Sequence, residues 1–186
     1  MSATHTRIAA SCAFRSMPVA QARYADVEVA PLGSDRRLAE PSSAMPRAFE
    51  IVVGNDRAVF DLLEDDAPTV CEAFVRSLPV DSFSVHAKFA GDELIVMVPF
   101  FTDPENEIFW VKPGDVGYYP GRQTICMFYG PTEPFGQVSV FARCREEHLP
   151  LLGTWGHEIL RAGSIPVIVQ VHDPSRPTTA EEVLSA

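Results

Sequence analysis

The clearest hydrophobic pattern begins near residue 49. Phe49, Ile51 and Val53 share one side of an extended chain, a Gly-Asn-Asp segment follows, and a second apolar run occupies residues 59–62. An alternation of this kind is typical of a β-strand, and the Gly-Asn-Asp segment favours a tight turn. The pattern therefore predicts a β-hairpin over residues 49–62.

A helical spacing follows between two prolines. Asp66 precedes Ala67-Pro68, an order typical of a helix N-terminus, so we expect Asp66 to be the capping residue. Apolar residues then recur at helical intervals up to Leu78, where Pro79 ends the helix.

A second hairpin is predicted next. The odd-numbered positions from Phe83 to Phe89 are apolar, whereas the even-numbered ones include His86 and Lys88, and a Gly-Asp turn leads into an apolar run at 94–98. One face of an antiparallel sheet commonly packs on the core while the other meets water. We therefore expect the apolar face to be buried, with His86 and Lys88 on an outer polar face.

The rest of the chain adds short β-like runs, each bounded by Gly or Pro. They occupy residues 108–111, 116–119, 124–129, 137–142 and 165–171. A mixed stretch over 146–161 predicts one short helix. Many short strands with two helices, and no repeated β-α-β unit, indicate a mainly β protein. The expected architecture is a closed antiparallel β-barrel with one or two flanking helices.

The two ends of the chain differ from this patterned region. Residues 1–45 are rich in Ala, Ser, Pro and Arg and show no periodicity, so we expect a poorly structured N-terminal extension. An appended segment and a transit peptide both fit the Arg bias of its first part. Residues 174–186 predict a polar C-terminal tail. A length of 186 residues favours one domain, which we place at 46–173.

Charge and cysteine content exclude several classes of function. Twenty-five acidic and fifteen basic residues give a net charge of −10, which would repel a nucleic acid backbone. The four cysteines form no C-x-x-C pair and no zinc-ligand spacing, so we expect reduced, apolar cysteines in a cytoplasmic protein. The apolar stretch at 94–101 is too short to cross a membrane, and the sequence predicts no membrane partner.

Short segments of the chain carry a resemblance to a known fold. Residues 49–74 have the strand, strand, helix order of a cyclophilin N-terminus. The other matching segments are His86-Ala87-Lys88, Gly91-Asp92-Glu93, Glu105-Asn106, Gly114-Asp115, Tyr118-Tyr119-Pro120-Gly121, Phe128-Tyr129-Gly130 and Gly136-Gln137. With them the chain resembles bacterial proteins of unknown function that have a cyclophilin-like fold. The resemblance implies a cyclophilin-like barrel over about residues 46–171 and implies no particular reaction.

The residues that prolyl isomerases of this fold use are missing from this chain. Isomerases of this fold carry an arginine just after a Phe-His pair on the third strand. At that place this sequence reads Ser84-Val85-His86-Ala87-Lys88. We therefore expect a cyclophilin-like domain without prolyl isomerase activity.

Two groups of residues have the chemistry of a binding site. His86 and Lys88 are expected on one strand face, which could also be an ordinary solvated face. Tyr119, Arg122 and Tyr129 place aromatic rings and a guanidinium around a turn, although alternation could equally assign these aromatic residues to the core. We predict that one cleft formed by these residues binds a small polar or anionic metabolite.

Two other functions fit the sequence. One is an enzyme acting on amide or X-Pro bonds, and the other is a structural subunit that pairs as a homodimer. The histidines at 148, 157 and 172 have no H-E-x-x-H spacing, so no metal and no cofactor are expected. Turnover of an amide would favour the enzyme, and a concentration-dependent mass would favour the subunit.

Overall fold

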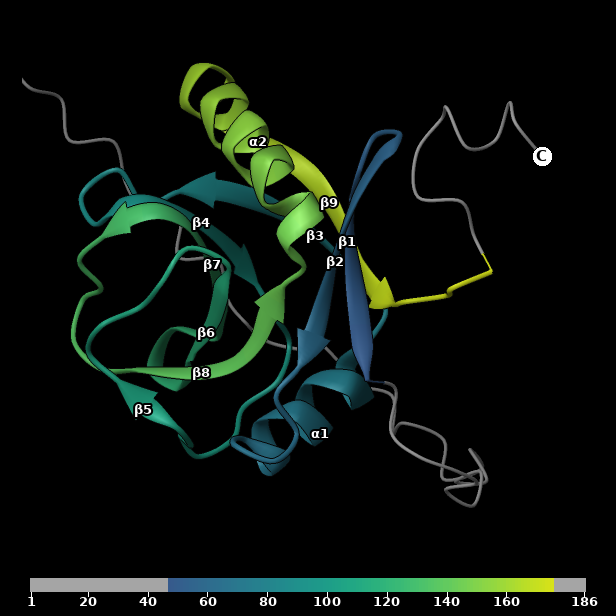
Figure 1. The fold of residues 1–186 in the computed structure, drawn as a ribbon, viewed down its shortest axis with the longest axis vertical. Helices are drawn as coiled ribbons and strands as arrows, with labels where there is room; N and C mark the ends of the chain where they lie inside the picture. Colours follow the sequence, from purple (N-terminus) through teal and green to yellow (C-terminus); the bar gives the residue numbers. More distant parts are fainter. Residues whose placement is uncertain (1–46, 176–186) are drawn as a thin grey trace, which may run out of the picture. The chain divides into compact units, whose positions relative to one another are not determined.

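A closed antiparallel barrel dominates the computed structural model, which describes residues 47–175 (Figure 1). Its eight strands follow the order β1, β9, β3, β4, β7, β6, β8 and β2, and pairing of β2 with both β8 and β1 closes the ring. The strands are β1 (Ala48–Val53), β2 (Asp56–Leu62), β3 (Val80–His86), β4 (Gly91–Met97), β6 (Asp115–Tyr119), β7 (Thr124–Thr132), β8 (Val138–Cys144) and β9 (Ser164–Val171). The predicted mainly β barrel is confirmed. A short strand, β5 (Glu107–Ile108), pairs with β8, so the longer strand predicted at 108–111 is wrong.

Aromatic side chains fill the barrel interior. Phe49 stacks on Phe60 with ring centroids 4.8 Å apart, and the edge of Phe74 meets Phe49 at 4.7 Å. All three rings are fully buried. Burying a side chain of this size stabilises a fold by about 1.5–3 kcal/mol, so these rings anchor the hairpin of β1 and β2 to the helix that follows.

That helix is α1 (Pro68–Ser77), and its N-terminus is capped from elsewhere in the chain. The N-cap position is Ala67, and no side chain at that position forms a capping bond. The Glu105 carboxylate instead accepts hydrogen bonds from the backbone amides of Thr69 at 2.8 Å and Val70 at 3.0 Å. The prediction that Asp66 caps the helix is therefore wrong, because a carboxylate from a distant loop satisfies these donors.

The second helix, α2 (Leu149–Ala162), follows a short turn, η2 (Glu146–His148), and is continuous through two glycines. Its buried face contributes Leu152, Trp155 and Ile159 to the interior core. The sequence predicts only a short helix here because Pro150, Gly153 and Gly156 disfavour a continuous one, but Pro150 lies in the first turn, where proline is tolerated. A Cβ atom at Gly156 would lie 2.5 Å from the Tyr129 hydroxyl, so glycine at this position allows the close approach of the helix to β7.

The side chains of β3 point the opposite way from the prediction. Phe83 is 62% exposed and Val85 41% exposed on the outside of the barrel, whereas Ser84 is buried and His86 half-buried on the inside. The helix α2 packs beside β3 and contributes its apolar face to the interior core, and the Ser84 hydroxyl is buried there without a hydrogen-bond partner. Tertiary packing therefore overrides the usual preference for burying the apolar face.

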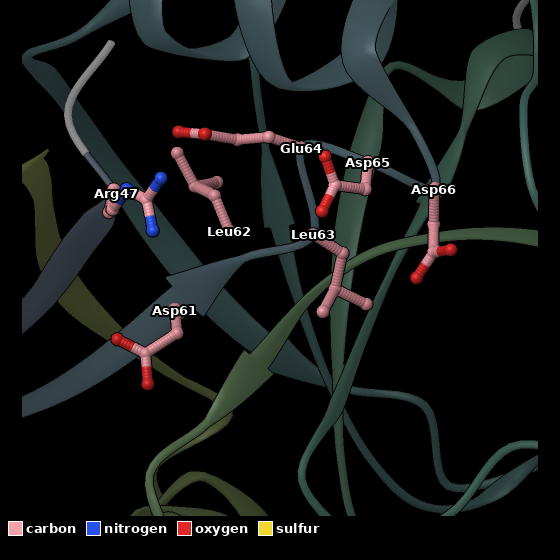
Figure 2. A pocket seen from close by; sticks show the side chains of 7 residues that line it. All are labelled: Arg47, Asp61, Leu62, Leu63, Glu64, Asp65 and Asp66. Atoms are coloured by element: carbon pink, nitrogen blue, oxygen red, sulfur yellow. The ribbon is translucent and has the colours of Figure 1, made fainter. Parts of the chain in front are cut away.

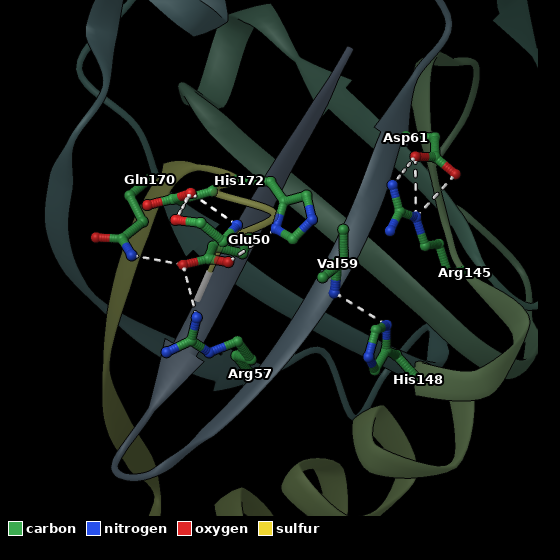
Figure 3. A network of polar contacts seen from close by, with 10 residues as sticks. Glu50, Arg57, Val59, Asp61, Arg145, His148, Gln170 and His172 are labelled. Atoms are coloured by element: carbon green, nitrogen blue, oxygen red, sulfur yellow. Dashed lines mark hydrogen bonds and ion pairs between the residues drawn. The ribbon is translucent and has the colours of Figure 1, made fainter. Parts of the chain in front are cut away.

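A polar network fastens the outer side of β1 and β9 (Figure 3). The fully buried Glu50 carboxylate accepts a 2.6 Å hydrogen bond from the Gln170 amide and lies 3.0 Å from Nδ1 of His172 and 3.6 Å from the Arg57 guanidinium. A buried carboxylate requires such partners. The network accounts for the one acid in the otherwise apolar first strand.

The predicted N-terminal extension, residues 1–45, lies outside the described residues, and so does most of the predicted C-terminal tail. Within residues 47–175 no helix is both long and apolar enough to cross a lipid bilayer. The cysteines at 71, 126 and 144 are all buried and free.

Candidate functional site

The predicted ligand-binding residues fall into two separate groups. His86 and Tyr129 meet on the inner side of the barrel wall, whereas Tyr119 and Arg122 meet on its outer side. Tyr129 packs against the interior core, while Tyr119 belongs to a second apolar cluster that includes Cys126. Successive side chains of a strand point to opposite faces, so β7 separates the groups. The prediction of one shared cleft is therefore wrong.

The inner pair joins β3 to β7 beneath α2. Nε2 of His86 lies 2.6 Å from the Tyr129 hydroxyl, with the two rings nearly perpendicular. Burial lowers the pKa of His86 and raises the pKa of Tyr129, so both groups are neutral near pH 7. Nε2 of His86 and the Tyr129 hydroxyl serve as partners of each other, whereas Nδ1 of His86 is buried without a hydrogen-bond partner. We interpret the pair as part of the fold.

Lys88 lies apart from both groups. β3 ends at His86, and Lys88 occupies the exposed turn that follows. The prediction of one strand face carrying His86 and Lys88 is therefore wrong. Its ammonium contributes to the lowered pKa of His86, after the larger effect of burial.

The outer group is built around Arg122. The turn η1 (Pro120–Arg122) directly follows Tyr119 and turns the guanidinium back over it, with Cζ 5.4 Å from the Tyr119 ring centroid and 4.9 Å from the Phe135 ring centroid. Gln123, in the left-handed region at φ 49°, completes the turn. Among residues 47–175, no carboxylate forms an ion pair with Arg122.

Beneath Arg122 lies a buried hydroxyl. The Tyr119 side chain is 9% exposed, and the Phe135 backbone amide faces its hydroxyl without completing a hydrogen bond of normal geometry. Burial, together with the neighbouring Cys126 and Glu93, raises the pKa of Tyr119 to about 12. The hydroxyl is therefore neutral and can donate a hydrogen bond.

Sequence reasoning missed the buried carboxyl group at this site. Glu93 is 3% exposed on the outer side of β4, with the Cys126 thiol as its hydrogen-bonding neighbour. Burial raises the pKa of Glu93, an effect that Cys126 and the Arg122 guanidinium partly offset. The available signal was an acid on the same side of the strand as Ile95 and Met97.

The Cys126 thiol completes this group. Burial raises its pKa far above the usual range, and the carboxyl of Glu93 adds to the effect. The thiol is therefore protonated and unreactive as a nucleophile. We call Glu93, Tyr119, Arg122, Cys126 and Phe135 the outer-face site. In this site the exposed Arg122 guanidinium lies above three buried groups that can carry a proton, namely the Glu93 carboxyl, the Tyr119 hydroxyl and the Cys126 thiol.

A pocket of about 350 Å³ elsewhere has the opposite charge (Figure 2). Its lining includes Asp61, Glu64, Asp65 and Asp66 against the single base Arg47. Such a lining disfavours the anionic ligand that the sequence predicts. Within the described part of the chain, no group of His, Cys, Asp and Glu residues is arranged to hold a metal ion.

Solved structures support the barrel fold. The chain is similar to a structure of McbB in complex with tryptophan, with a TM-score of 0.63 and 19% identity over 71% of this chain and 47% of McbB. It therefore spans about half of that protein. It is also similar to the solution structure of the hypothetical protein AF2241 from Archaeoglobus fulgidus, with a TM-score of 0.54 and 22% identity over 72% of this chain and all of that one.

At these identities the two structures show the shared fold alone. No curated protein matches the sequence. A family model described as "Protein of unknown function (DUF3830)" matches residues 50–169, which cover every barrel strand at least in part. The chain belongs to the DUF3830 family.

Proposed function

We propose that the protein binds a small carboxylate-bearing metabolite at the outer-face site. The observation that carries this proposal is the exposed Arg122 guanidinium, which rests against the rings of Tyr119 and Phe135 and forms no ion pair within residues 47–175. Its planar fork of N–H donors matches a carboxylate.

The contacts of Arg122 with the Tyr119 and Phe135 rings preorganise its guanidinium for binding a carboxylate. A guanidinium that stacks on aromatic rings uses its face and keeps the N–H groups at its edge available. The two rings also restrict the side chain before a ligand arrives, which lowers the entropy cost of binding.

Glu93 sets how binding should depend on pH. Burial raises the pKa of Glu93 above 4.5, and at pH values below this pKa the carboxyl is protonated and does not compete with an anionic ligand for Arg122. Once the pH rises through that pKa, the carboxylate opposes a bound anion. We therefore expect affinity for a carboxylate to fall as the pH rises through the pKa of Glu93.

Several finer predictions from the sequence remain part of this proposal. A cyclophilin-like relationship and a bacterial source stay predictions that rest on the sequence resemblance. The structure of McbB with tryptophan makes L-tryptophan a reasonable additional probe. An enzyme acting on amide or X-Pro bonds and a homodimer both stay predictions, as does a cytoplasmic location.

Calorimetric titration with benzoate and benzamide tests the proposal, because the two molecules share a ring and differ in charge. We expect benzoate to bind and benzamide to bind far more weakly. Arg122→Lys keeps the charge and loses the fork, which should cost about 1.5–3 kcal/mol, roughly 10- to 100-fold in affinity. Arg161→Lys, at the exposed end of α2, is the matched control. Equal binding of both probes, or of Arg122→Lys and wild type, would contradict the proposal.

A further inference from the structure

A second pocket lies on the outer side of the barrel, at the other end of β6. It encloses about 460 Å³, a volume typical of sites for small molecules. Asp115 lines this pocket, whereas Tyr119 of the outer-face site lies four residues further along the same strand. The strand rise separates the two positions by about 13 Å. The pocket lining therefore includes no residue of the outer-face site, although its Leu63, Ile108 and Val140 belong to the same apolar cluster as Tyr119.

Two exposed aromatic rings line this pocket. Trp110 is 81% exposed and its neighbour Phe109 is 58% exposed, whereas Trp155, the second tryptophan of the chain, is 2% exposed. Leaving an indole in water forgoes a large favourable burial energy. Apolar side chains of Leu63, Ile108 and Val140 line the same pocket.

The loop carrying these rings is held firmly in place. The buried Asp115 carboxylate accepts a 2.8 Å hydrogen bond from the Lys112 backbone amide and two more from the Arg143 guanidinium. The amide of Gly114 donates to the Phe128 carbonyl at 2.7 Å. These bonds fix the chain after Trp110, and the pairing of Ile108 with Val138 fixes the chain before Phe109.

The unpaired charges of the pocket have both signs. Arg143 and Asp115 neutralise each other, with 2.8 Å between the closest atoms. The Lys112 ammonium and the Asp66 carboxylate also line the pocket, and neither forms an ion pair with another residue in the described range 47–175. A ligand that satisfies both must carry an anionic and a cationic group.

We propose that this pocket, the Trp110 pocket, binds a small aromatic zwitterion, a molecule with a planar ring, a carboxylate and an ammonium group. The ring packs on Trp110 and Phe109, the carboxylate meets Lys112, and the ammonium meets Asp66. An aromatic amino acid has this chemistry.

Tryptophan fluorescence provides the readout, because Trp110 is the exposed one of only two tryptophans. L-phenylalanine is the probe, and its two relatives, 3-phenylpropionate and phenethylamine, each lack one charge. We expect a saturable emission change with L-phenylalanine and clearly weaker binding of both relatives. Trp110→Phe should abolish the emission change, while titration calorimetry of Trp110→Phe combined with Arg122→Lys still detects binding through the phenyl ring at position 110.

Charge variants test the two contacts separately. Lys112→Gln should weaken the binding of L-phenylalanine and 3-phenylpropionate by about tenfold and leave the binding of phenethylamine unchanged. Asp66→Asn should weaken the binding of L-phenylalanine and phenethylamine. The matched controls are Lys88→Gln, the other lysine, and Asp65→Asn, the adjacent exposed acid.

Three results would overturn the proposal: no saturable binding, 3-phenylpropionate binding as tightly as L-phenylalanine, or Lys112→Gln and Asp66→Asn behaving like their controls. Arg122→Lys should leave L-phenylalanine binding at this pocket unchanged. Failure here is therefore distinguishable from failure of benzoate binding at the outer-face site.

Discussion

The two sides of β4 and β7 pack in different ways. On the inner side, Leu94 and Met127 join the aromatic core, and Nε2 of His86 pairs with the Tyr129 hydroxyl, while Nδ1 of His86 and the Ser84 hydroxyl are buried without a hydrogen-bond partner. On the outer side, polar groups lie within a smaller apolar cluster, and Arg122 is left without a carboxylate among residues 47–175. The unpaired polar atoms of the inner side are buried, whereas the Arg122 guanidinium is exposed and therefore accessible to a ligand.

The largest expected effect concerns the inner side. Phe49→Ala removes a fully buried ring that contacts Phe60 and Phe74, so the free energy of unfolding should fall by about 3–5 kcal/mol. Phe135→Ala, at a ring that is 70% exposed on the outer side, should change it by about 0.5 kcal/mol or less. Urea denaturation measures both. Similar decreases in the free energy of unfolding for the two variants would contradict the conclusion that the inner core determines stability and the outer ring of Phe135 does not.

The contact between α2 and Tyr129 can be tested with two glycines on one helix. A Cβ at Gly156 would lie 2.5 Å from the Tyr129 hydroxyl, so Gly156→Ala should destabilise the protein by about 1–3 kcal/mol and disturb the His86 hydrogen bond. At Gly153 the nearest Tyr129 atom would be at 3.9 Å, an ordinary contact. Gly153→Ala should therefore stabilise the helix by up to about 1 kcal/mol. Thermal unfolding and the imidazole NMR signals of His86 report the outcome; two alanines with equal effects would refute the close contact.

A smaller effect, visible as a change with pH, concerns Glu93. Burial raises the pKa of Glu93 in the folded protein above 4.5, the ordinary value that applies in the unfolded chain. At a pH between the unfolded-state and folded-state pKa values, the folded protein therefore holds a proton that the unfolded chain releases. Stability from this group is complete at low pH and is lost as the pH rises through the folded-state pKa. Glu93→Gln should therefore gain stability relative to wild type over that rise. Glu158→Gln, at an exposed position of α2, controls for the loss of one surface carboxyl. A difference between Glu93→Gln and wild type that stays constant with pH would contradict the burial of this carboxyl.

Local patterns predicted the elements of the fold well. The hairpin of β1 and β2 follows from alternation, and α1 follows from helical spacing between prolines, because both signals are contained within a few neighbouring residues. The cap on α1 was not predictable in this way, since Glu105 lies far from Thr69 along the sequence. The orientation of β3 was not predictable for the same reason, because α2, which packs beside its inward face, lies far from β3 along the sequence.

The candidate site was predictable only in part. Tyr119 and Arg122 are close in sequence, and their pairing was found. The approach of Phe135 and Glu93 depends on how β4, β7 and the loop after β7 come together, which no local spacing encodes. His86 was misassigned to the same cleft because alternation identifies two faces of a strand without saying which one faces the interior.

The central claim is that ligand recognition takes place at Arg122 on the outer side of the barrel. The most direct measurement follows the NMR signals of the arginine Nε–H groups and the histidine imidazoles during titration with benzoate. The Arg122 Nε–H signal, assigned with Arg122→Lys, should shift in a saturable manner while the His86 signals stay in place. A shift of the His86 signals with an unchanged Arg122 signal would contradict the account and move the site to the inner side of the barrel.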